Sequence, residues 1–185
     1  MRHQIKKWRV IDSEYVMRRP WLTVRRERVE LPDGRQHPEY YVLEYPTWVN
    51  IIARATDGNY VLVEQYRHGI GEVSIELCAG CVDEGETPLD GARRELLEET
   101  GFGGGRWKLL AKMAPNSSTS SNWCYCFVAD GVKRIDDHQH LDATEDIAVR
   151  IVSREELFRL LSDGEIKQAM MAAPLWKYFA TEKTD

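Results

Sequence analysis

The sequence predicts an α/β (α+β) protein in which a small antiparallel β subdomain precedes a larger domain of mixed strands and helices. Strand-like segments fill the first part of the chain, and amphipathic helical segments appear only after residue 87. The 185 residues, 43% of them hydrophobic, can bury one sizeable core or one core with a small appended sheet. Because the character of the chain changes near Pro46, we expect a β subdomain over residues 1–47 and an α/β domain over residues 48–185.

Three short strands are expected in the N-terminal part. They are residues 8–17 (WRVIDSEYVM), 21–31 (WLTVRRERVEL) and 39–45 (EYYVLEY). A Pro-Asp-Gly-Arg turn at 32–35 joins the second strand to the third, because proline and glycine favour the backbone angles of tight turns. The three strands would form a meander.

The larger domain opens with three more strands. Residues 48–55 and 60–67 flank the turn TDGN at 56–59 and indicate a hairpin-like pair. Residues 72–77 form a further strand that leads into Ala79 and Gly80. Together these segments predict a sheet.

A capped helix is expected over residues 88–100. Thr87 is a good N-cap, Pro88 suits the first helical position, and Gly101 suits the position after the last turn. At about 100° per residue, a stripe of apolar side chains can face a core while glutamates cover the adjacent arc. The apolar stripe consists of Leu89, Ala92 and Leu96.

The last third of the chain supplies more strands and then helices. Residues 107–113, 123–130 and 147–153 are strand candidates. Ser153 opens a capping box, Ser-Arg-Glu-Glu, ahead of an amphipathic segment. A final helical segment is expected over residues 164–180, with a bend or division at its proline, Pro174.

Charge and hydropathy restrict the classes of partner. The net charge is −5, from 30 acidic and 25 basic residues, and the basic residues are dispersed along the chain. This distribution disfavours duplex nucleic acid and anionic membranes as partners. No apolar run approaches 18 residues, and the N-terminal MRHQIKKWRV lacks the apolar stretch of a secretory signal, so we expect a cytoplasmic protein.

Four cysteines raise the alternative of a zinc site. Cys78 and Cys81 form C-x2-C, and Cys124 and Cys126 form C-x-C, but neither pair has the spacing typical of structural zinc. We expect buried or half-buried thiols in a reducing compartment.

Three carboxylates converge within one turn of the expected helix. Glu95, Glu98 and Glu99 indicate either a solvated acidic face or a cation site. In a partly buried cleft, two carboxylates about 5 Å apart repel by roughly 3 kcal/mol at an effective dielectric near 20. Such a cluster needs a cation, and hard oxygen ligands favour Mg²⁺ or Mn²⁺.

The spacing of these residues resembles the Nudix box with no position missing. The matching residues are Gly80, Glu86, Arg94, Glu95, Leu96, Glu98, Glu99, Gly101 and Phe102. Residues 63–80 (VEQYRHGIGEVSIELCAG) are similar to the entry of the ADP-ribose and nucleoside-diphosphate-sugar pyrophosphatases within that superfamily. The similarity covers most of residues 8–180, firmly at the box and loosely elsewhere.

The resemblance implies the Nudix fold, an α/β/α sandwich around a mixed sheet, and a divalent metal site. Arg94 would orient the acidic cluster through charge-assisted hydrogen bonds, and Glu86 would support the loop. Mg²⁺ is the implied cofactor, with Mn²⁺ possible. The implied metal ligands are the side chains of Glu95, Glu98 and Glu99 and the backbone carbonyl of Ala79.

The activity implied is hydrolysis of the diphosphate bond of nucleoside diphosphate sugars, including ADP-ribose, to a nucleoside monophosphate and a sugar phosphate. Glu145 is the first choice for the general base, alongside the catalytic Glu98 and Arg94, with Asp142 and Asp146 as alternates. Two alternatives stay open. One is a Nudix hydrolase of dinucleotides or dinucleoside polyphosphates, and the other is a non-catalytic sensor of ADP-ribose-like ligands, which the intact glutamate set disfavours.

Substrate contacts and assembly also follow from the resemblance. Arg67 would contact the diphosphate, Glu76 would contact the ribose or support another residue of the site, and Trp21 would stack on the base; each also has an ordinary structural interpretation. The polar segment 114–122 is either a substrate loop or a solvated connection between strands. Relatives exchange the N-terminal sheet between subunits, so a homodimer is expected.

Overall fold

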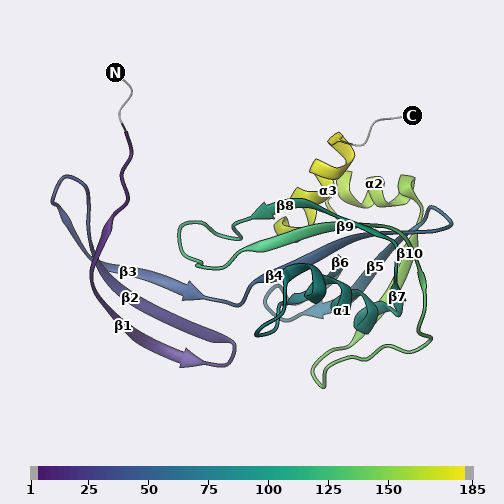
Figure 1. The fold of residues 1–185 in the computed structure, drawn as a ribbon, viewed down its shortest axis with the longest axis horizontal. Coiled ribbons are helices and arrows are strands. Elements are labelled where there is room, and N and C mark those ends of the chain that lie inside the picture. Colours follow the sequence, from purple (N-terminus) through teal and green to yellow (C-terminus); the bar gives the residue numbers. More distant parts are fainter. Residues whose placement is uncertain (1–3, 182–185) are drawn as a thin grey trace. The chain divides into compact units, whose positions relative to one another are not determined.

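The computed structural model describes residues 4–181, which belong to two compact units (Figure 1). The first unit combines Met1–Pro46 with Ala114–Asn122, and the second combines Thr47–Met113 with Trp123–Asp185. No helix within residues 4–181 is long and apolar enough to cross a bilayer.

The first unit is the predicted meander, β1 (Arg9–Arg19), β2 (Leu22–Glu30) and β3 (Gln36–Glu44), paired antiparallel in that order. Its second segment docks on β3. Leu43 N–H donates to the Thr119 carbonyl at 2.7 Å, and Ser121 N–H donates to the Leu43 carbonyl at 3.0 Å. The polar segment 114–122 is therefore hydrogen-bonded to the first sheet, a contact that local sequence patterns do not reveal.

The second unit is built on a mixed seven-stranded sheet. Its order is β10-β5-β6-β4-β9-β7, with β8 also paired to β9, and β4 and β9 run parallel. The strands are β4 (Trp48–Ala55), β5 (Tyr60–Arg67), β6 (Glu72–Cys81), β7 (Phe102–Gly103), β8 (Arg106–Met113), β9 (Cys124–Arg134) and β10 (Ile147–Val152).

The expected hairpin of β4 and β5 forms only next to its turn. Two residue pairs connect these strands, Ala53 with Val61 and Arg54 with Tyr60. Beyond them β6 lies between the two strands and pairs antiparallel with both. Inserting β6 gives every strand of this region two neighbours, which satisfies the backbone groups that a simple hairpin leaves unpaired.

Helices cover both faces of this sheet, as the α/β/α expectation requires. The helix α1 (Pro88–Thr100) buries Ala92 and Leu96 against one face, and Leu89 packs beside them. The helices α2 (Arg154–Ser162) and α3 (Ala169–Thr181) pack on the other face. One cluster of buried side chains therefore lies between the sheet and α1, and the other lies between the sheet and the two C-terminal helices.

The predicted ends of α1 are confirmed. The Thr87 hydroxyl accepts the Asp90 N–H at 3.2 Å, and Pro88 occupies the first turn. Gly101 ends the helix at φ 72°, where its N–H donates to the Leu97 carbonyl. A side chain there would also place a Cβ 2.3 Å from the Asp136 carbonyl oxygen, so glycine is required for two reasons. Ser153 likewise caps α2 by accepting the Glu156 N–H.

The last helix begins later than the sequence predicts. Residues 164–168 are not helical, because Gly164 adopts φ 75° and Ile166 inserts into the core under α2 and α3. The helix α3 then contains Pro174 without being divided there. The proline removes the N–H that would bond the Met170 carbonyl, and the buried Asn50 side chain of β4 donates to that carbonyl instead, at 2.6 Å.

We expect Asn50→Ala to lower the free energy of unfolding by about 1–3 kcal/mol, since it leaves the partly buried Met170 carbonyl without this donor. In a Pro174→Ala background the same substitution should cost less, because residue 174 regains an N–H for the Met170 carbonyl. Urea unfolding of the four proteins measures both costs. Equal costs in the two backgrounds would contradict this account of how the proline is tolerated.

Candidate active site

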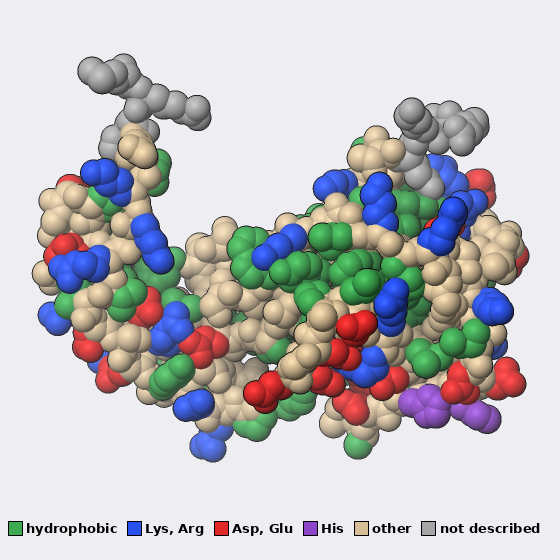
Figure 2. All heavy atoms as spheres, in the orientation of Figure 1, with side chains coloured by type: hydrophobic (Ala, Val, Ile, Leu, Met, Phe, Trp, Pro, Cys, Tyr) green, Lys and Arg blue, Asp and Glu red, His purple; other side chains and the backbone are tan. Residues whose placement is uncertain are grey.

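The acidic residues of the box lie where α1 passes the end of β6. Figure 2 shows acidic side chains gathered over the part of the surface occupied by α1 in Figure 1. Glu95, Glu98 and Glu99 come from α1, while Ala79 and Gly80 come from β6. One helix therefore brings three carboxylates to a short stretch of strand backbone.

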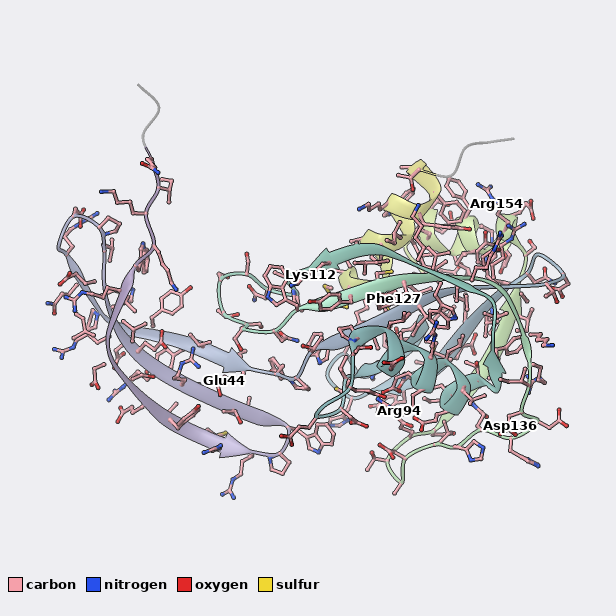
Figure 3. All side chains as sticks on the ribbon, in the orientation of Figure 1. Glu44, Arg94, Lys112, Phe127, Asp136 and Arg154 are labelled. Carbon is pink, nitrogen blue, oxygen red and sulfur yellow. The ribbon has the colours of Figure 1, made fainter. Side chains whose placement is uncertain are left out.

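Arg94, labelled on α1 in Figure 3, lies at the centre of this group. Its guanidinium has five N–H donors, and each has an acceptor. Nε and Nη2 bind the two oxygens of Glu86 at 3.0 and 3.1 Å, and Nη2 also donates to the Cys81 carbonyl at 2.9 Å. Nη1 donates to Glu95 and to Glu98, both at 3.0 Å. The arginine thus ties the loop before α1 to two of the three carboxylates on it.

These contacts fix the charge states around Arg94. Hydrogen bonds to Glu86 and the neighbouring glutamates raise the pKa of the Arg94 guanidinium above its ordinary value. The hydrogen bonds from Arg94 lower the pKa of Glu86 in return. Both groups therefore stay ionised at neutral pH, and their bidentate pair is of the strong, charge-assisted kind.

Glu99 is the most deeply buried of the three carboxylates, with 2% of its surface exposed. It accepts the Ala79 N–H at 3.1 Å, a contact that favours the ionised carboxylate. Burial nevertheless raises the pKa of Glu99 to about 8. Burial also raises the pKa of Glu95, where the Arg94 charge partly offsets it. The ionised forms of both groups are disfavoured unless further positive charge is supplied.

Gly80 allows the helix and strand to approach closely. A Cβ at this position would lie 2.1 Å from the carboxyl carbon of Glu95. Only glycine therefore lets the Glu95 carboxylate lie directly against the strand backbone beside Ala79.

The donor set fits a hard divalent cation. Three carboxylates and the backbone at Ala79 and Gly80 supply oxygen atoms only, as Mg²⁺ and Mn²⁺ prefer. Within residues 4–181, no three His, Cys, Asp or Glu side chains already converge on one point. Glu95 and Glu98 instead point to Arg94, and Glu99 points to the Ala79 N–H. Side-chain rotation of these glutamates would accompany metal binding.

The two candidate substrate residues on β5 and β6 form an ion pair with each other. Arg67 donates to Glu76 through Nε at 2.9 Å and Nη2 at 2.5 Å. Glu76 is almost fully buried, whereas 39% of the Arg67 side chain is exposed. The charges of Glu99 and Glu145 contribute to the raised pKa of Arg67, after its hydrogen bond to Glu76. Arg67 thus faces the acidic site and stays accessible from solvent.

Glu145 lies in a tight turn before β10. Its N–H donates to the Asp142 carbonyl, and its carboxylate accepts the Asp142 N–H, both at 2.9 Å. Its negative charge adds to the burial that raises the pKa values of Glu95 and Glu99. The Glu145 charge also contributes to the raised pKa of Arg67, so Arg67, Glu95 and Glu99 all lie within electrostatic reach of Glu145.

Trp21 lies outside the strands, in the turn between β1 and β2, and 82% of its surface is exposed. The prediction that Trp21 belongs to a strand is wrong, because β2 begins at Leu22. Its exposure also excludes a place in a core. A tryptophan this exposed has its whole ring face open to a ligand or to another chain.

The cysteines are free thiols, as expected. Cys78, Cys124 and Cys126 are buried, and Cys81 is partly buried. Sequence reasoning missed the contact that one of them makes, in which the Cys81 carbonyl accepts a hydrogen bond from Arg94. Every residue type has a backbone carbonyl, so only the fold reveals this contact.

Two family models match the chain. The model described as a NUDIX domain matches residues 44–173, and the model described as a nucleoside diphosphate sugar hydrolase N-terminal domain matches residues 8–43. A solved structure described as the crystal structure of ADP compounds hydrolase superposes with a TM-score of 0.83 at 24% identity. That match covers 97% of this chain and 96% of the other, and at this identity it supports the fold alone.

Several curated proteins are similar over most of their length. The chain is 29% identical over 164 residues to a protein of Mycobacterium tuberculosis (strain ATCC 25618 / H37Rv) named ADP-ribose pyrophosphatase, covering 88% of this chain and 79% of that one. A Bacillus subtilis (strain 168) protein of the same name is 27% identical over 146 residues, with coverages of 79% and 78%. A Bacillus methanolicus protein named methanol dehydrogenase activator is also 27% identical, with 85% of each chain covered.

Glu99 should make the stability of the metal-free protein depend on pH. Its pKa of about 8 in the folded chain lies above the value of an unfolded glutamate, about 4.3. Its contribution is therefore fully present below about pH 4 and is lost as the pH rises through about 8. We expect the free energy of unfolding in chelator to fall less steeply from pH 5 to 9 in Glu99→Gln than in wild type. Urea unfolding measures this, with Glu165→Gln as a partly exposed control, and identical slopes in all three proteins would contradict the assignment.

Proposed function

The chain belongs to the Nudix hydrolase family, and from that premise we propose that it hydrolyses the diphosphate bond of ADP-ribose and related nucleoside diphosphate sugars. The products are a nucleoside monophosphate and a sugar phosphate, which for ADP-ribose are AMP and ribose 5-phosphate. The observation that carries the proposal is the placement of three carboxylates at the end of β6, where Arg94 binds Glu95 and Glu98 and the Ala79 N–H binds Glu99. The match of residues 8–43 to the nucleoside diphosphate sugar hydrolase N-terminal domain, and the names of two relatives, support the substrate class.

Each side chain of the site has a distinct role in this proposal. Glu95, Glu98, Glu99 and the Ala79 carbonyl hold the divalent cation, Mg²⁺ or Mn²⁺, which when bound offsets the negative charge of the diphosphate and acidifies water. Arg94 binds one oxygen of Glu95 and one of Glu98 while staying charged itself, and rotation of these side chains would turn the second oxygen of each toward the cation. Glu86 and the Cys81 carbonyl keep Arg94 in place in turn.

The reaction needs a general base and a positively charged side chain that orients the diphosphate. Glu145 accepts a proton from the attacking water while the oxygen of that water forms a bond to phosphorus. The bond between phosphorus and the bridging oxygen breaks, with the attacking and leaving oxygens in line. We assign the base to Glu145 rather than to Asp142, because the Asp142 backbone closes the turn that carries Glu145. Arg67, half-exposed on the same face, binds the diphosphate, and Glu76 holds its guanidinium in two-point contact.

The first unit supports a homodimer with an exchanged N-terminal sheet. In β1 only Ile11 is partly buried, and the other ten residues are exposed, among them Tyr15, Val16 and Met17. A sheet with so many exposed apolar side chains gains stability when a second copy covers them. Trp21, at the tip of the β1–β2 turn, is then available to stack on a nucleobase. The subdomain division at residue 47 and the cytoplasmic location stay predictions from the sequence.

A substrate panel tests the activity directly. We expect the protein with Mg²⁺ to convert ADP-ribose to AMP and ribose 5-phosphate, with slower turnover of some other nucleoside diphosphate sugars, as measured by chromatography of the products. Glu98→Gln should lower kcat by about 100-fold or more, because it removes a metal ligand. Glu165→Gln, which alters a partly exposed glutamate paired with Arg159, should match wild type.

Other outcomes of the panel distinguish the alternatives. Turnover restricted to dinucleotides or dinucleoside polyphosphates would identify a different Nudix substrate class. Tight binding of ADP-ribose without product would favour a sensor. Full activity in chelator would contradict the cation site itself.

The dimer is tested by light scattering after size-exclusion chromatography. We expect twice the chain mass of 21.4 kDa at micromolar concentration. Val16→Glu, which places a charge among the exposed apolar residues of β1, should shift the protein toward the monomer. A monomeric wild-type protein would contradict the exchanged sheet.

A further inference from the structure

The segment that follows β9 caps the C-terminal end of α1, the helix that carries the three glutamates of the site. The last carbonyls of a helix lack intrahelical donors and need partners from elsewhere. Here the Gly101 carbonyl accepts the N–H groups of Ile135 and Asp136 at 2.9 and 3.1 Å, and the Glu98 carbonyl accepts the His140 N–H at 2.8 Å. Asp136 is labelled in Figure 3 on this segment, which leads from β9 toward Glu145 and β10.

Gln139 adds a bond of a different kind, because its side chain reaches two separate elements. Its amide nitrogen donates to the carbonyl of Glu99, in the last turn of α1, and to the carbonyl of Ile147 at 3.1 Å. Ile147 is the first residue of β10 and pairs with Gln65 of β5. One amide group therefore joins the two ends of residues 140–146 and fastens both to the helix that carries the acidic cluster.

Glu145 lies inside the loop that this amide closes. It is six residues after Gln139 and two before Ile147, and the Asp142–Glu145 turn makes the intervening chain compact. Without the amide bonds, the short stretch from His140 to β10 would keep the hydrogen bond from the His140 N–H to α1 and the packing of β10 against that helix. The distance of Glu145 from the Glu95 and Glu99 carboxylates thus depends on the Gln139 bonds that close this loop.

We propose that Gln139 is a positioning residue for the hydrolysis, which sets the place of the Glu145 carboxylate by tying Ile147 to the Glu99 carbonyl. The inference rests on the proposed function and goes beyond it, since it assigns a role to a residue outside the Nudix box and outside the metal and substrate contacts. Two features of the amide are needed: its length, which spans helix and strand, and its two N–H donors.

If Gln139 only capped the helix, its loss would change stability rather than kcat. Loss of a cap lowers stability, but it leaves the turnover of the folded protein unchanged at temperatures well below the midpoint. Misplacement of a general base lowers kcat instead and leaves the affinities for metal and substrate intact. Displacements of about 1 Å at a reacting group can cost up to roughly 100-fold in rate.

The test uses two substitutions of Gln139 in the full-length protein with Mg²⁺ and ADP-ribose. Gln139→Met keeps the length and loses the donors, and Gln139→Glu places a carboxylate opposite two carbonyl oxygens. We expect kcat to fall roughly tenfold in the first and further in the second, with KM for ADP-ribose and for Mg²⁺ within about twofold of wild type. His138→Ala, an exposed neighbour on the same segment, serves as the matched control and should keep wild-type kcat.

A double-mutant cycle with Glu145→Gln separates this inference from the function on which it rests. If Gln139 acts through Glu145, Gln139→Met should have almost no further effect on kcat once Glu145 is glutamine. Hydrogen exchange at the His140 amide, measured on each variant, shows whether the loop has left the helix. The exchange should quicken in Gln139→Met and stay slow in His138→Ala.

Three results would overturn the inference. Wild-type kcat in Gln139→Met, with Glu145→Gln strongly impaired, would leave the proposed base in place and remove the role of Gln139. Equal effects of Gln139→Met in both backgrounds would mean that the side chain acts elsewhere. A Glu145→Gln protein with full activity would overturn both the base assignment and this inference.

Discussion

The site depends on one arginine with all its donors in use. Arg94 joins the Glu86 carboxylate, the Cys81 carbonyl and two carboxylates of α1 through five hydrogen bonds. A lysine would supply the same charge but not the planar set of five donors. The helix can therefore carry adjacent glutamates on one face without the repulsion that would otherwise open that face. The loop before α1 and the helix itself are held in one arrangement by the same group.

The third carboxylate is balanced differently. Glu99 is buried and accepts the Ala79 N–H rather than a guanidinium N–H, and burial raises its pKa to about 8. Its negative charge is thus the most costly of the three, and it gains the most from a bound cation. The site combines two carboxylates that bind the Arg94 guanidinium with a third that accepts a backbone N–H instead. This difference fits a centre that must accept positive charge from a ligand and still fold without it.

Much of the fold could be predicted because the signals are local. The strands β4 and β5 and the helix α1 match their predicted bounds, since alternation, the Thr87 cap and the Gly101 stop act over a few residues. Predictions failed where distant residues decide the outcome. The helix α3 starts late because Ile166 is drawn into the core, and it continues through its proline because Asn50 of β4 replaces the missing donor.

The sequence by itself determined the kind of chemistry, because the types and spacing of the box residues place three carboxylates and one arginine on a single helical face. Only the tertiary structure decided how those charges are compensated and what surrounds them. The Cys81 carbonyl on Arg94, the ion pair of Arg67 with Glu76, and the Gln139 bridge between α1 and β10 all join segments that are separated along the chain. Helical periodicity extends over a few turns, whereas these contacts depend on how the sheet and helices pack, and no local pattern specifies that packing.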